Sequence, residues 1–293
     1  DRAALGQAVL EELVPHTGRA VRVGITGPPG VGKSTFIEAL GLFLLDQGLR
    51  VAVLAVDPSS PVSGGSILGD KTRMEQLALR EGAFIRPSPS SGSLGGVAHR
   101  TREAMLVCEA AGYDVVLVET VGIGQSEVTV ASMVDFFLGL LLPGGGDELQ
   151  GIKKGVMELA DAVVVNKADG ETATVAETTR REYEGALTLI HGPSESWTPV
   201  ALTASALERR GIDTVWESVL AHRTRLTETG ELARRRREQA RAWMWSLVEE
   251  ELRRRFRSDP EVARALPVLE REVEQQRTTP AAAARALLAA FGH

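Results

Sequence analysis

Residues Val21 to Thr35 read VRVGITGPPGVGKST, and this stretch decides the fold of the chain. An apolar, largely β-branched run enters the spacing G-x-x-x-x-G-K-S, and a segment with helical character follows it. Glycines let backbone N–H groups converge on phosphate oxygens, and the start of the following helix carries a partial positive charge at the same place. A glycine-rich turn with a chance lysine would not need both flanking elements. The stretch therefore predicts a phosphate-binding loop in which Lys33 reaches the β- and γ-phosphates and Ser34 holds magnesium.

The composition of the whole chain limits the classes of protein to which it can belong. Its 293 residues and 43% apolar content are sufficient for a large core, whereas a net charge of −6 lacks the basic excess that a nucleic-acid or acidic-membrane surface requires. The longest apolar run, from Met133 to Leu142, is too short to cross a bilayer and predicts a buried strand. The single cysteine, Cys108, cannot form an internal disulfide, and the first residues show no signal-peptide pattern. We therefore expect a cytoplasmic protein that binds neither nucleic acid nor membrane.

Lysine is scarce in this sequence, and its positions are informative. Arginine supplies 28 of the 33 basic residues, and the lysines are Lys33, Lys71, Lys153, Lys154 and Lys167. A genome that favours arginine codons explains the scarcity but not the placement, because a compact ammonium and a planar guanidinium are not interchangeable at a phosphate or a purine. The lysines are therefore candidates for nucleotide chemistry.

Carboxylates follow the second expected strand. Asp57 ends the strand expected over 50–56, and the carboxyl end of a parallel strand lies near the ligand site, although an Asx turn is the alternative. A polar loop then leads to a helix start, where Asp70 is expected to accept a magnesium-bound water and either Lys71 or Arg73 to face phosphate. The alternative for these residues is a helix cap with solvated charges.

A third strand, expected over 114–119, is continuously apolar and ends in a carboxylate. This pattern is similar to the second magnesium motif of nucleotide hydrolases, with Glu119 in the place often taken by aspartate and Gly122 free to donate its N–H to the γ-phosphate. Gln125 follows at a helix start, where it either orients the attacking water or caps the helix. The segment therefore predicts the metal side of the site.

The segment Asn166-Lys167-Ala168-Asp169 follows a run of valines and has the pattern N-K-x-D. Its aspartate accepts two hydrogens from the N1 and amino edge of guanine, and its lysine stem packs on the purine face. Adenine has no such paired donors. After the two preceding motifs, this one predicts guanine as the base. Ser205, Ala206 and Leu207 follow a later strand and are expected in a loop whose backbone reads the guanine O6.

Six phrases of the sequence together resemble one family. GPPGVGKST, VDPSS, GGSILGDKTRM, VETVGIGQSE, GGGDELQGIKKG and NKAD occur over roughly residues 15 to 230, in the order found in the ArgK/MeaB-type P-loop GTPases. These are chaperones of cobalamin-dependent acyl-CoA mutases such as methylmalonyl-CoA mutase. The resemblance implies GTP and GDP with magnesium as ligands, and a mutase, its adenosyltransferase and a second copy of the chain as partners.

The resemblance also extends the set of expected site residues. The nucleotide contacts are expected at Gly27, Pro29, Gly30, Val31, Gly32, Lys33, Ser34, Thr35, Gly122, Asn166, Lys167, Asp169, Ser205, Ala206 and Leu207. The magnesium-side groups are expected at Ser34, Asp57, Asp70 and Glu119. The catalytic groups are expected at Lys33, Glu119, Gln125, Lys71, Lys153 and Lys154.

The expected architecture is an α/β P-loop NTPase with a predominantly parallel sheet flanked by helices and with helical N- and C-terminal extensions. We assign residues 1–18 to an N-terminal helix, 19–229 to the GTPase domain and 230–293 to a helical extension. Alternating charges in this extension favour a solvated face over nucleic-acid binding. The resemblance implies a dimerisation arm there, with packing inside the chain as the alternative. Helix breaks are expected near Pro260, Pro267 and Pro280.

The loop over 144–155, GGGDELQGIKKG, is expected to respond to a partner. Its glycines make it costly to order, so Lys153 or Lys154 is expected to act as a catalytic cation only after a mutase binds the loop. The alternative is a surface connection whose lysines aid solubility.

The function predicted from these features is GTP hydrolysis that gates cobalamin loading and protection of an acyl-CoA mutase. A metal-delivery GTPase and a P-loop small-molecule kinase are the alternatives. The first needs a histidine or cysteine cluster, which five scattered histidines and one cysteine do not supply. The second is less consistent with the guanine motif.

Overall fold

The computed structural model describes residues 2–56, 74–86, 94–120, 125–144, 154–192 and 196–291. The chain forms two compact units, Asp1–Gln239 and Ala240–His293. The first unit contains the sheet and the helices that cover it, and the second contains helices alone. No helix in the described ranges is long and apolar enough to cross a membrane.

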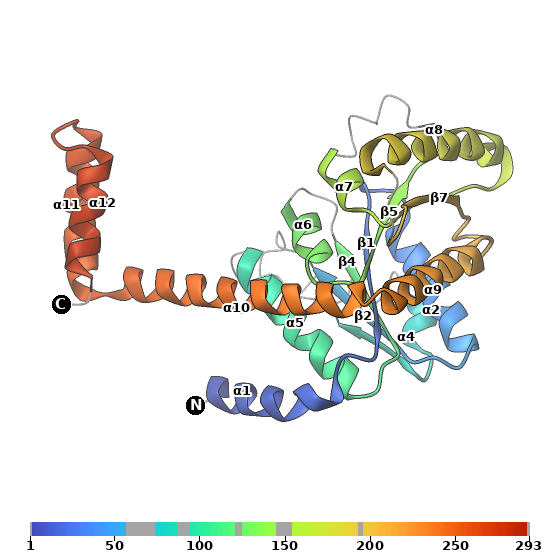
Figure 1. Cartoon of the computed structure of the whole chain (residues 1–293), viewed down its shortest axis with the longest axis horizontal. Helices are drawn as coiled ribbons and strands as arrows, with labels where there is room; N and C mark the ends of the chain where they lie inside the picture. The colour runs from blue at the N-terminus through green and yellow to red at the C-terminus, as the bar shows by residue number, and fades with distance from the viewer. Residues whose placement is uncertain are drawn as a thin grey trace. The chain divides into compact units, whose positions relative to one another are not determined.

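Within the described part of the chain, the first unit is built on a seven-stranded sheet in the order β3-β2-β4-β1-β5-β6-β7, and every neighbouring pair is parallel (Figure 1). The strands are β1 (Val21–Thr26), β2 (Val51–Val56), β3 (Ala83–Arg86), β4 (Val115–Thr120), β5 (Phe136–Leu141), β6 (Ala162–Val165) and β7 (Val200–Thr203). Strands β2, β5 and β6 are continuous apolar runs, as expected of strands whose two faces are both covered by helices. The predicted fold class is confirmed.

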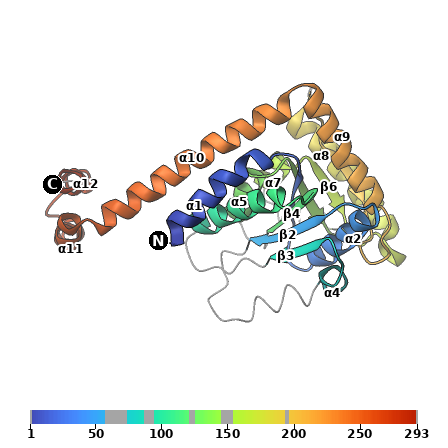
Figure 2. The same cartoon turned by 90° about the horizontal axis from the view of Figure 1, so that it is seen from below.

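The helices cover both faces of the sheet (Figure 2). Packing contacts put α2 and α9 on one face and α5, α6, α7 and α8 on the other. The described helices of the first unit are α1 (Arg2–Leu13), η1 (Val14–His16), α2 (Lys33–Asp46), α4 (Glu75–Ala78), α5 (Leu94–Ala110), α6 (Gln125–Ala131), α7 (Lys154–Leu159), η3 (Gly170–Thr172), α8 (Ala173–His191) and α9 (Ile212–Glu228). The chain then continues through α10 (Glu231–Ser258), α11 (Pro260–Glu274) and α12 (Pro280–Ala290).

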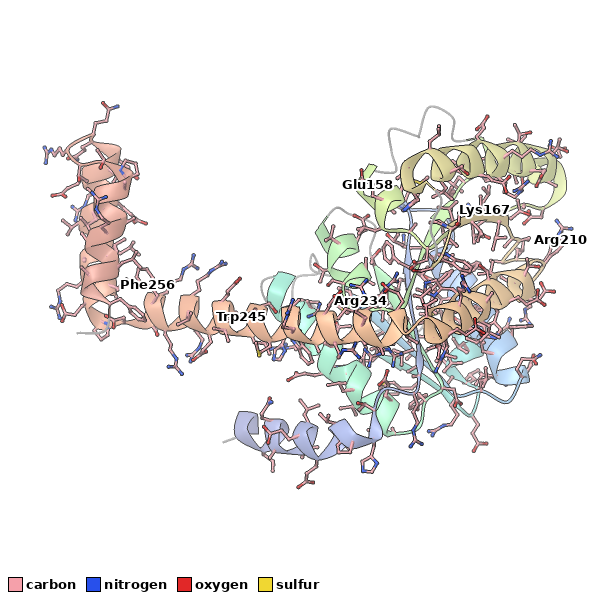
Figure 3. All side chains as sticks on the ribbon, in the orientation of Figure 1. Glu158, Lys167, Arg210, Arg234, Trp245 and Phe256 are labelled. Carbon is pink, nitrogen blue, oxygen red and sulfur yellow. The ribbon has the colours of Figure 1, made fainter. Side chains whose placement is uncertain are left out.

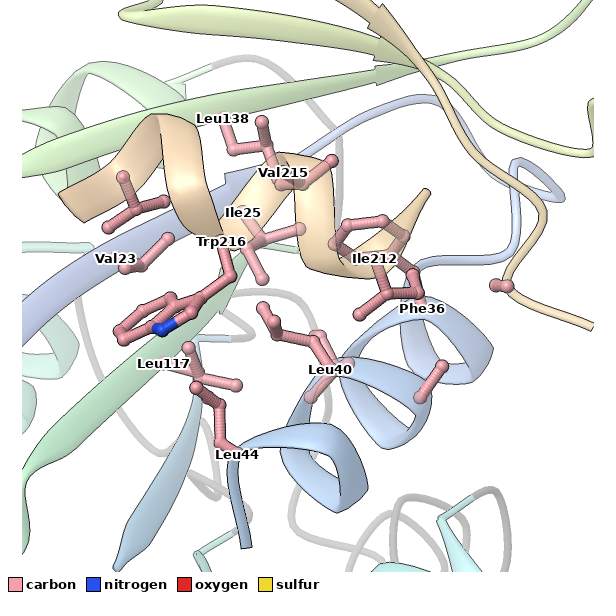
Figure 4. Packing of buried hydrophobic residues seen from close by; sticks show 14 of the residues in the cluster. Val23, Ile25, Phe36, Leu40, Leu44, Leu117, Leu138, Ile212, Val215 and Trp216 are labelled. Atoms are coloured by element: carbon pink, nitrogen blue, oxygen red, sulfur yellow. The ribbon is translucent and has the colours of Figure 1, made fainter. Parts of the chain in front are cut away.

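The core between α2, α9 and the sheet fixes the helix that follows the phosphate loop. Apolar residues at i and i+4 of α2, Phe36 and Leu40, belong to the same buried cluster as Ile212 and Trp216 of α9 and Ile25 of β1 (Figure 4). Full burial of a large apolar side chain contributes about 1.5–3 kcal/mol to folding. The start of α2 is therefore held firmly at the carboxyl end of β1.

On the opposite face of the sheet, α6 packs closely against β1 at Gly24. A Cβ added to Gly24 would lie 2.8 Å from side-chain atoms of Phe137 and Val130 and 3.0 Å from Val134. Contacts this short are repulsive, so a side chain at position 24 would require its neighbours to move. Glycine is thus required here by the close approach of α6 to the sheet.

A buried charge network joins the beginning of α10 to the amino ends of β1 and β5. Arg236 donates from Nε and Nη2 to the carboxylate of Asp135, at 2.7 and 2.6 Å, and the backbone N–H of Arg22 donates to the same carboxylate at 3.0 Å. Arg22 in turn pairs with Glu109 of α5 at 2.6 Å. Burial disfavours the charge of Arg236, but its hydrogen bonds to Asp135 and the nearby negative charges raise its pKa, so this arginine stays ionised.

In the second unit, α11 and α12 pack on each other, and each begins with a proline after a capping side chain. The carboxylate of Asp259 accepts from the first turn of α11, and the hydroxyl of Thr279 does so for α12. The predicted helix break near Pro267 is wrong, because Pro267 lies inside α11. A proline removes only its own N–H from the helix ladder, and the packing of α11 against α12 holds the remaining turns together.

Cys108 is buried in the core between α5 and the sheet. Burial raises the pKa of its thiol to about 11, so the reactive thiolate is scarce near neutral pH. We expect iodoacetamide to modify Cys108 at pH 8 only after the protein unfolds. Mass spectrometry of native and urea-unfolded samples tests this, and rapid alkylation of the native protein would contradict it.

Candidate functional site

The phosphate loop lies between β1 and α2, and two of its glycines are required by geometry. Gly27 has φ 155°, and a Cβ there would lie 2.7 Å from the carbonyl oxygen of Leu140. Gly32 has φ 91° and is the N-cap of α2. Lys33 is the first residue of α2, and its Nζ donates to the carbonyls of Gly27 and Pro28 at 2.8 and 3.2 Å. The lysine ammonium thus lies over the loop where phosphate oxygens would take the place of these carbonyls.

The metal side of the site joins α2 to β4. The Oγ of Ser34 donates to Oε1 of Glu119 at 3.4 Å, because β4 lies beside β1 in a register that pairs Ile25 with Glu119. A hydroxyl and a carboxylate oxygen are ligands that suit magnesium, so this donor set fits the metal expected from the sequence.

Two buried threonines that no sequence motif marks link the strands β1 and β4. Thr120 donates from Oγ1 to Oγ1 of Thr26 at 2.8 Å, and both side chains are buried. Thr26 immediately precedes the phosphate loop, and Thr120 immediately follows Glu119. Position next to a motif was the only available signal, since nothing in the sequence pairs residues so far apart.

On the guanine side, one asparagine connects the phosphate loop to a second loop. Asn166 follows β6; its Nδ2 donates to the carbonyl of Val31 at 2.9 Å, and its Oδ1 accepts from the N–H of Ala206 at 3.1 Å. Lys167, labelled in Figure 3, has the left-handed φ of 58° and donates from Nζ to the carbonyl of Gly30 at 2.8 Å. The N-K-x-D segment is therefore held against the phosphate loop.

Asp169 is oriented by the loop that follows β7. The hydroxyl of Ser205 donates to Oδ2 of Asp169, and Ser205 pairs through its backbone with Arg210 at 2.9 and 3.0 Å. Arg210, also labelled in Figure 3, donates to the carbonyl of Ala168. Leu207 is exposed at the tip of this loop. The carboxylate that would read guanine is thus fixed from both the 166–169 and the 205–210 segments.

The described residues therefore bring together the predicted segments Gly27 to Thr35, Glu119, Asn166 to Asp169 and Ser205 to Leu207. Other predicted residues lie outside the described part of the chain: Asp57, Asp70, Lys71, Arg73, Gly122 and Lys153. Gln125 and Lys154 begin α6 and α7, and their side chains also lie outside it.

Comparison with known proteins agrees with this arrangement. The model of the family described as methylmalonyl-CoA mutase-associated GTPase MeaB matches residues 1–261. GTPase ArgK of Escherichia coli is 56% identical over 249 residues, which are 85% of this chain and 75% of that protein. The mitochondrial methylmalonic aciduria type A homolog of Mus musculus is 50% identical over 270 residues, which are 92% of this chain and 65% of that protein.

A solved structure extends the comparison to three dimensions. The crystal structure of LAO/AO transport system kinase is similar with a TM-score of 0.78 at 42% identity, covering 97% of this chain and 86% of that one. The resemblance drawn from the sequence motifs is confirmed. The chain belongs to the MeaB family of methylmalonyl-CoA mutase-associated P-loop GTPases, and its reaction is the hydrolysis of GTP.

Proposed function

We propose that the chain uses magnesium-dependent GTP hydrolysis to gate the loading of cobalamin into methylmalonyl-CoA mutase and to protect the loaded mutase. The observation that carries the proposal is the convergence of the phosphate loop, Glu119 and the N-K-x-D segment in a chain of the MeaB family. We also propose the adenosyltransferase of the mutase as a second partner, and the cytoplasm as the compartment in which the chain acts.

In the proposed reaction, the Nζ of Lys33 donates hydrogen bonds to β- and γ-phosphate oxygens in place of the carbonyl oxygens of its own loop. Ser34 and Glu119 hold magnesium, which, when bound, neutralises charge that develops on the phosphates. Asp169 accepts from the guanine edge, and the stem of Lys167 packs on the purine face. Asp57 and Asp70 belong to the same proposed metal side.

We further propose that residues 230–293, of which 230–239 belong to the first compact unit, form a dimerisation arm that follows the helix over 1–18 and the GTPase domain over 19–229. Exposed apolar side chains on the second-unit part of α10 support this: Met244, Trp245, Val248 and Leu252. A helix turns once every 3.6 residues, so Met244, Val248 and Leu252 share a face. An exposed apolar face of this kind is typical of a surface that another chain covers.

The proposed gating function is tested by replacing Lys153, which precedes α7, and Lys154, which begins it. Basal GTP hydrolysis of a Lys153→Ala/Lys154→Ala variant is expected to equal that of wild type, because the loop is expected to act only when a mutase orders it. Addition of methylmalonyl-CoA mutase should accelerate wild type, and the variant should lose most of this acceleration. Transfer of adenosylcobalamin to the mutase, followed by its absorbance, should require GTP and fail with a non-hydrolysable analogue.

An Arg181→Ala variant is the matched control, because Arg181 is an exposed cation on α8. It should retain the acceleration by the mutase. Undiminished acceleration of the double lysine variant would remove the role assigned to this loop. Cobalamin transfer at equal rates with and without GTP would contradict the gating function itself.

The metal-delivery alternative has no specific observation in its favour. Among the residues that the structure describes, no group of three or more histidine, cysteine, aspartate or glutamate side chains is arranged to hold a metal ion.

A further inference from the structure

We propose that the hydrogen bond between Thr26 and Thr120 positions Glu119 relative to the phosphate loop and thereby sets the strength of magnesium binding. Both threonines act through their neighbours and are positioning residues. The inference rests on the proposed magnesium role of Ser34 and Glu119.

Thr26 is 1% exposed and Thr120 is 0% exposed, and their Oγ1 atoms are 2.8 Å apart. A buried hydroxyl without a hydrogen-bond partner has lost its hydrogen bonds to water and gained none in the protein, which destabilises the fold. The bond between these two side chains is therefore strongly favoured over any arrangement that separates them.

The paired register of β1 and β4 ends at Ile25 and Glu119, and Thr26 and Thr120 are the next residues of the two strands. The hydrogen bond between their side chains thus extends the contact between the two strands by one residue. Beyond this point β1 enters the phosphate loop at Gly27.

Magnesium requires nearly octahedral coordination at about 2.0–2.1 Å and tolerates little displacement of its ligands. Ser34 and Glu119 lie on different elements, with their oxygens 3.4 Å apart. Thr120 directly follows Glu119, and Thr26 ends the strand that leads through the phosphate loop to Ser34. Loss of the bond between the two threonines should therefore weaken magnesium binding more than nucleotide binding.

The experiment measures GDP affinity in magnesium and in EDTA for wild type, Thr26→Val, Thr120→Val and Thr120→Ser. Valine keeps the shape of threonine and removes the hydroxyl, whereas serine keeps the hydroxyl. We call the affinity for GDP in magnesium divided by the affinity in EDTA the magnesium gain. It should fall about five- to tenfold in each valine variant, as for the loss of one buried hydrogen bond. Affinity in EDTA should change by less than about twofold. Thr120→Ser should retain the magnesium gain.

A double variant separates positioning from packing. Replacing both hydroxyls by methyl groups removes the unpaired buried oxygen, so Thr26→Val/Thr120→Val should regain thermal stability lost by the single variants. Its magnesium gain should stay low, because the directional bond is still absent. Thr101→Val is the control: Thr101 is equally buried, and its hydroxyl donates to the carbonyl of Val97 within α5. It should lower stability without changing the magnesium gain.

Two outcomes overturn the inference: an unchanged magnesium gain in the single valine variants, or a gain that recovers together with stability in the double variant. Ser34→Ala and Glu119→Gln test the underlying site in the same assay. If these two variants keep the magnesium gain, the proposed metal site is wrong. If they lose it while the threonine variants keep it, only the positioning role fails.

Discussion

An Asp169→Asn variant is expected to bind GTP about 2–4 kcal/mol more weakly than wild type, because a buried guanine edge then loses its paired acceptor. The carboxylate of Asp169 is already held by the hydroxyl of Ser205, so no rearrangement of the loop is needed before the base binds. The asparagine side chain has nearly the same shape but presents an NH2 group where one acceptor stood. Equilibrium binding of fluorescent GDP and GTP analogues measures the loss.

Xanthosine triphosphate provides a test of the mechanism. Xanthine carries a carbonyl in place of the guanine amino group, so the asparagine amide can donate to it, and the variant should prefer this nucleotide over GTP. Glu171→Gln is the matched control, since Glu171 is exposed on η3 and two residues away. It should leave both affinities unchanged. Equal binding of ATP and GTP by wild type would contradict the role of Asp169.

The second large effect concerns folding. Replacement of Asp135 by alanine is expected to lower the free energy of unfolding by about 3–5 kcal/mol, the cost of leaving one partner of a buried ion pair alone. Asp135 is 3% exposed, and the side chain of Arg236 is 17% exposed. The substitution would also leave the N–H of Arg22 without its acceptor. Urea unfolding followed by circular dichroism measures the change.

Arg234→Met on the same helix is the control for this prediction. Arg234 pairs with Glu231 and Glu238 on the surface, and its side chain is 55% exposed. Exposed pairs of this kind contribute little to stability because solvent screens them, so the midpoint of unfolding should hardly move. Similar midpoints for the Asp135 and Arg234 variants would show that the buried network does not hold the first unit together.

The sequence predicted those parts of the site whose signal is local. Val21 to Thr35 contains strand, loop and helix start in one continuous stretch, and the structure forms all three there. The N-K-x-D segment likewise depends on four adjacent residues, and the parallel sheet brings it to the phosphate loop. Short-range spacing and apolar runs are the features that a single sequence displays directly.

The remaining connections depend on residues far apart in the chain. Thr26 and Thr120 are separated by 94 positions, and Arg236 and Asp135 by 101. Threonine and arginine are common residues with no periodic signal, so nothing local marks these partners. Pro267 shows the opposite failure: its local preference against helix is real, but packing within the second unit outweighs it.

The close packing at Gly24 restricts the direction in which α6 can move. Val130 of α6 already approaches the backbone of β1 as closely as a glycine allows, and repulsion rises steeply at shorter distances. Displacement of α6 toward the sheet is therefore blocked by repulsion, whereas withdrawal from it is opposed by the loss of apolar burial and of dispersion contacts. Since α6 begins six residues after Glu119, we expect a change at the metal side that moves this helix to move it away from the sheet rather than toward it.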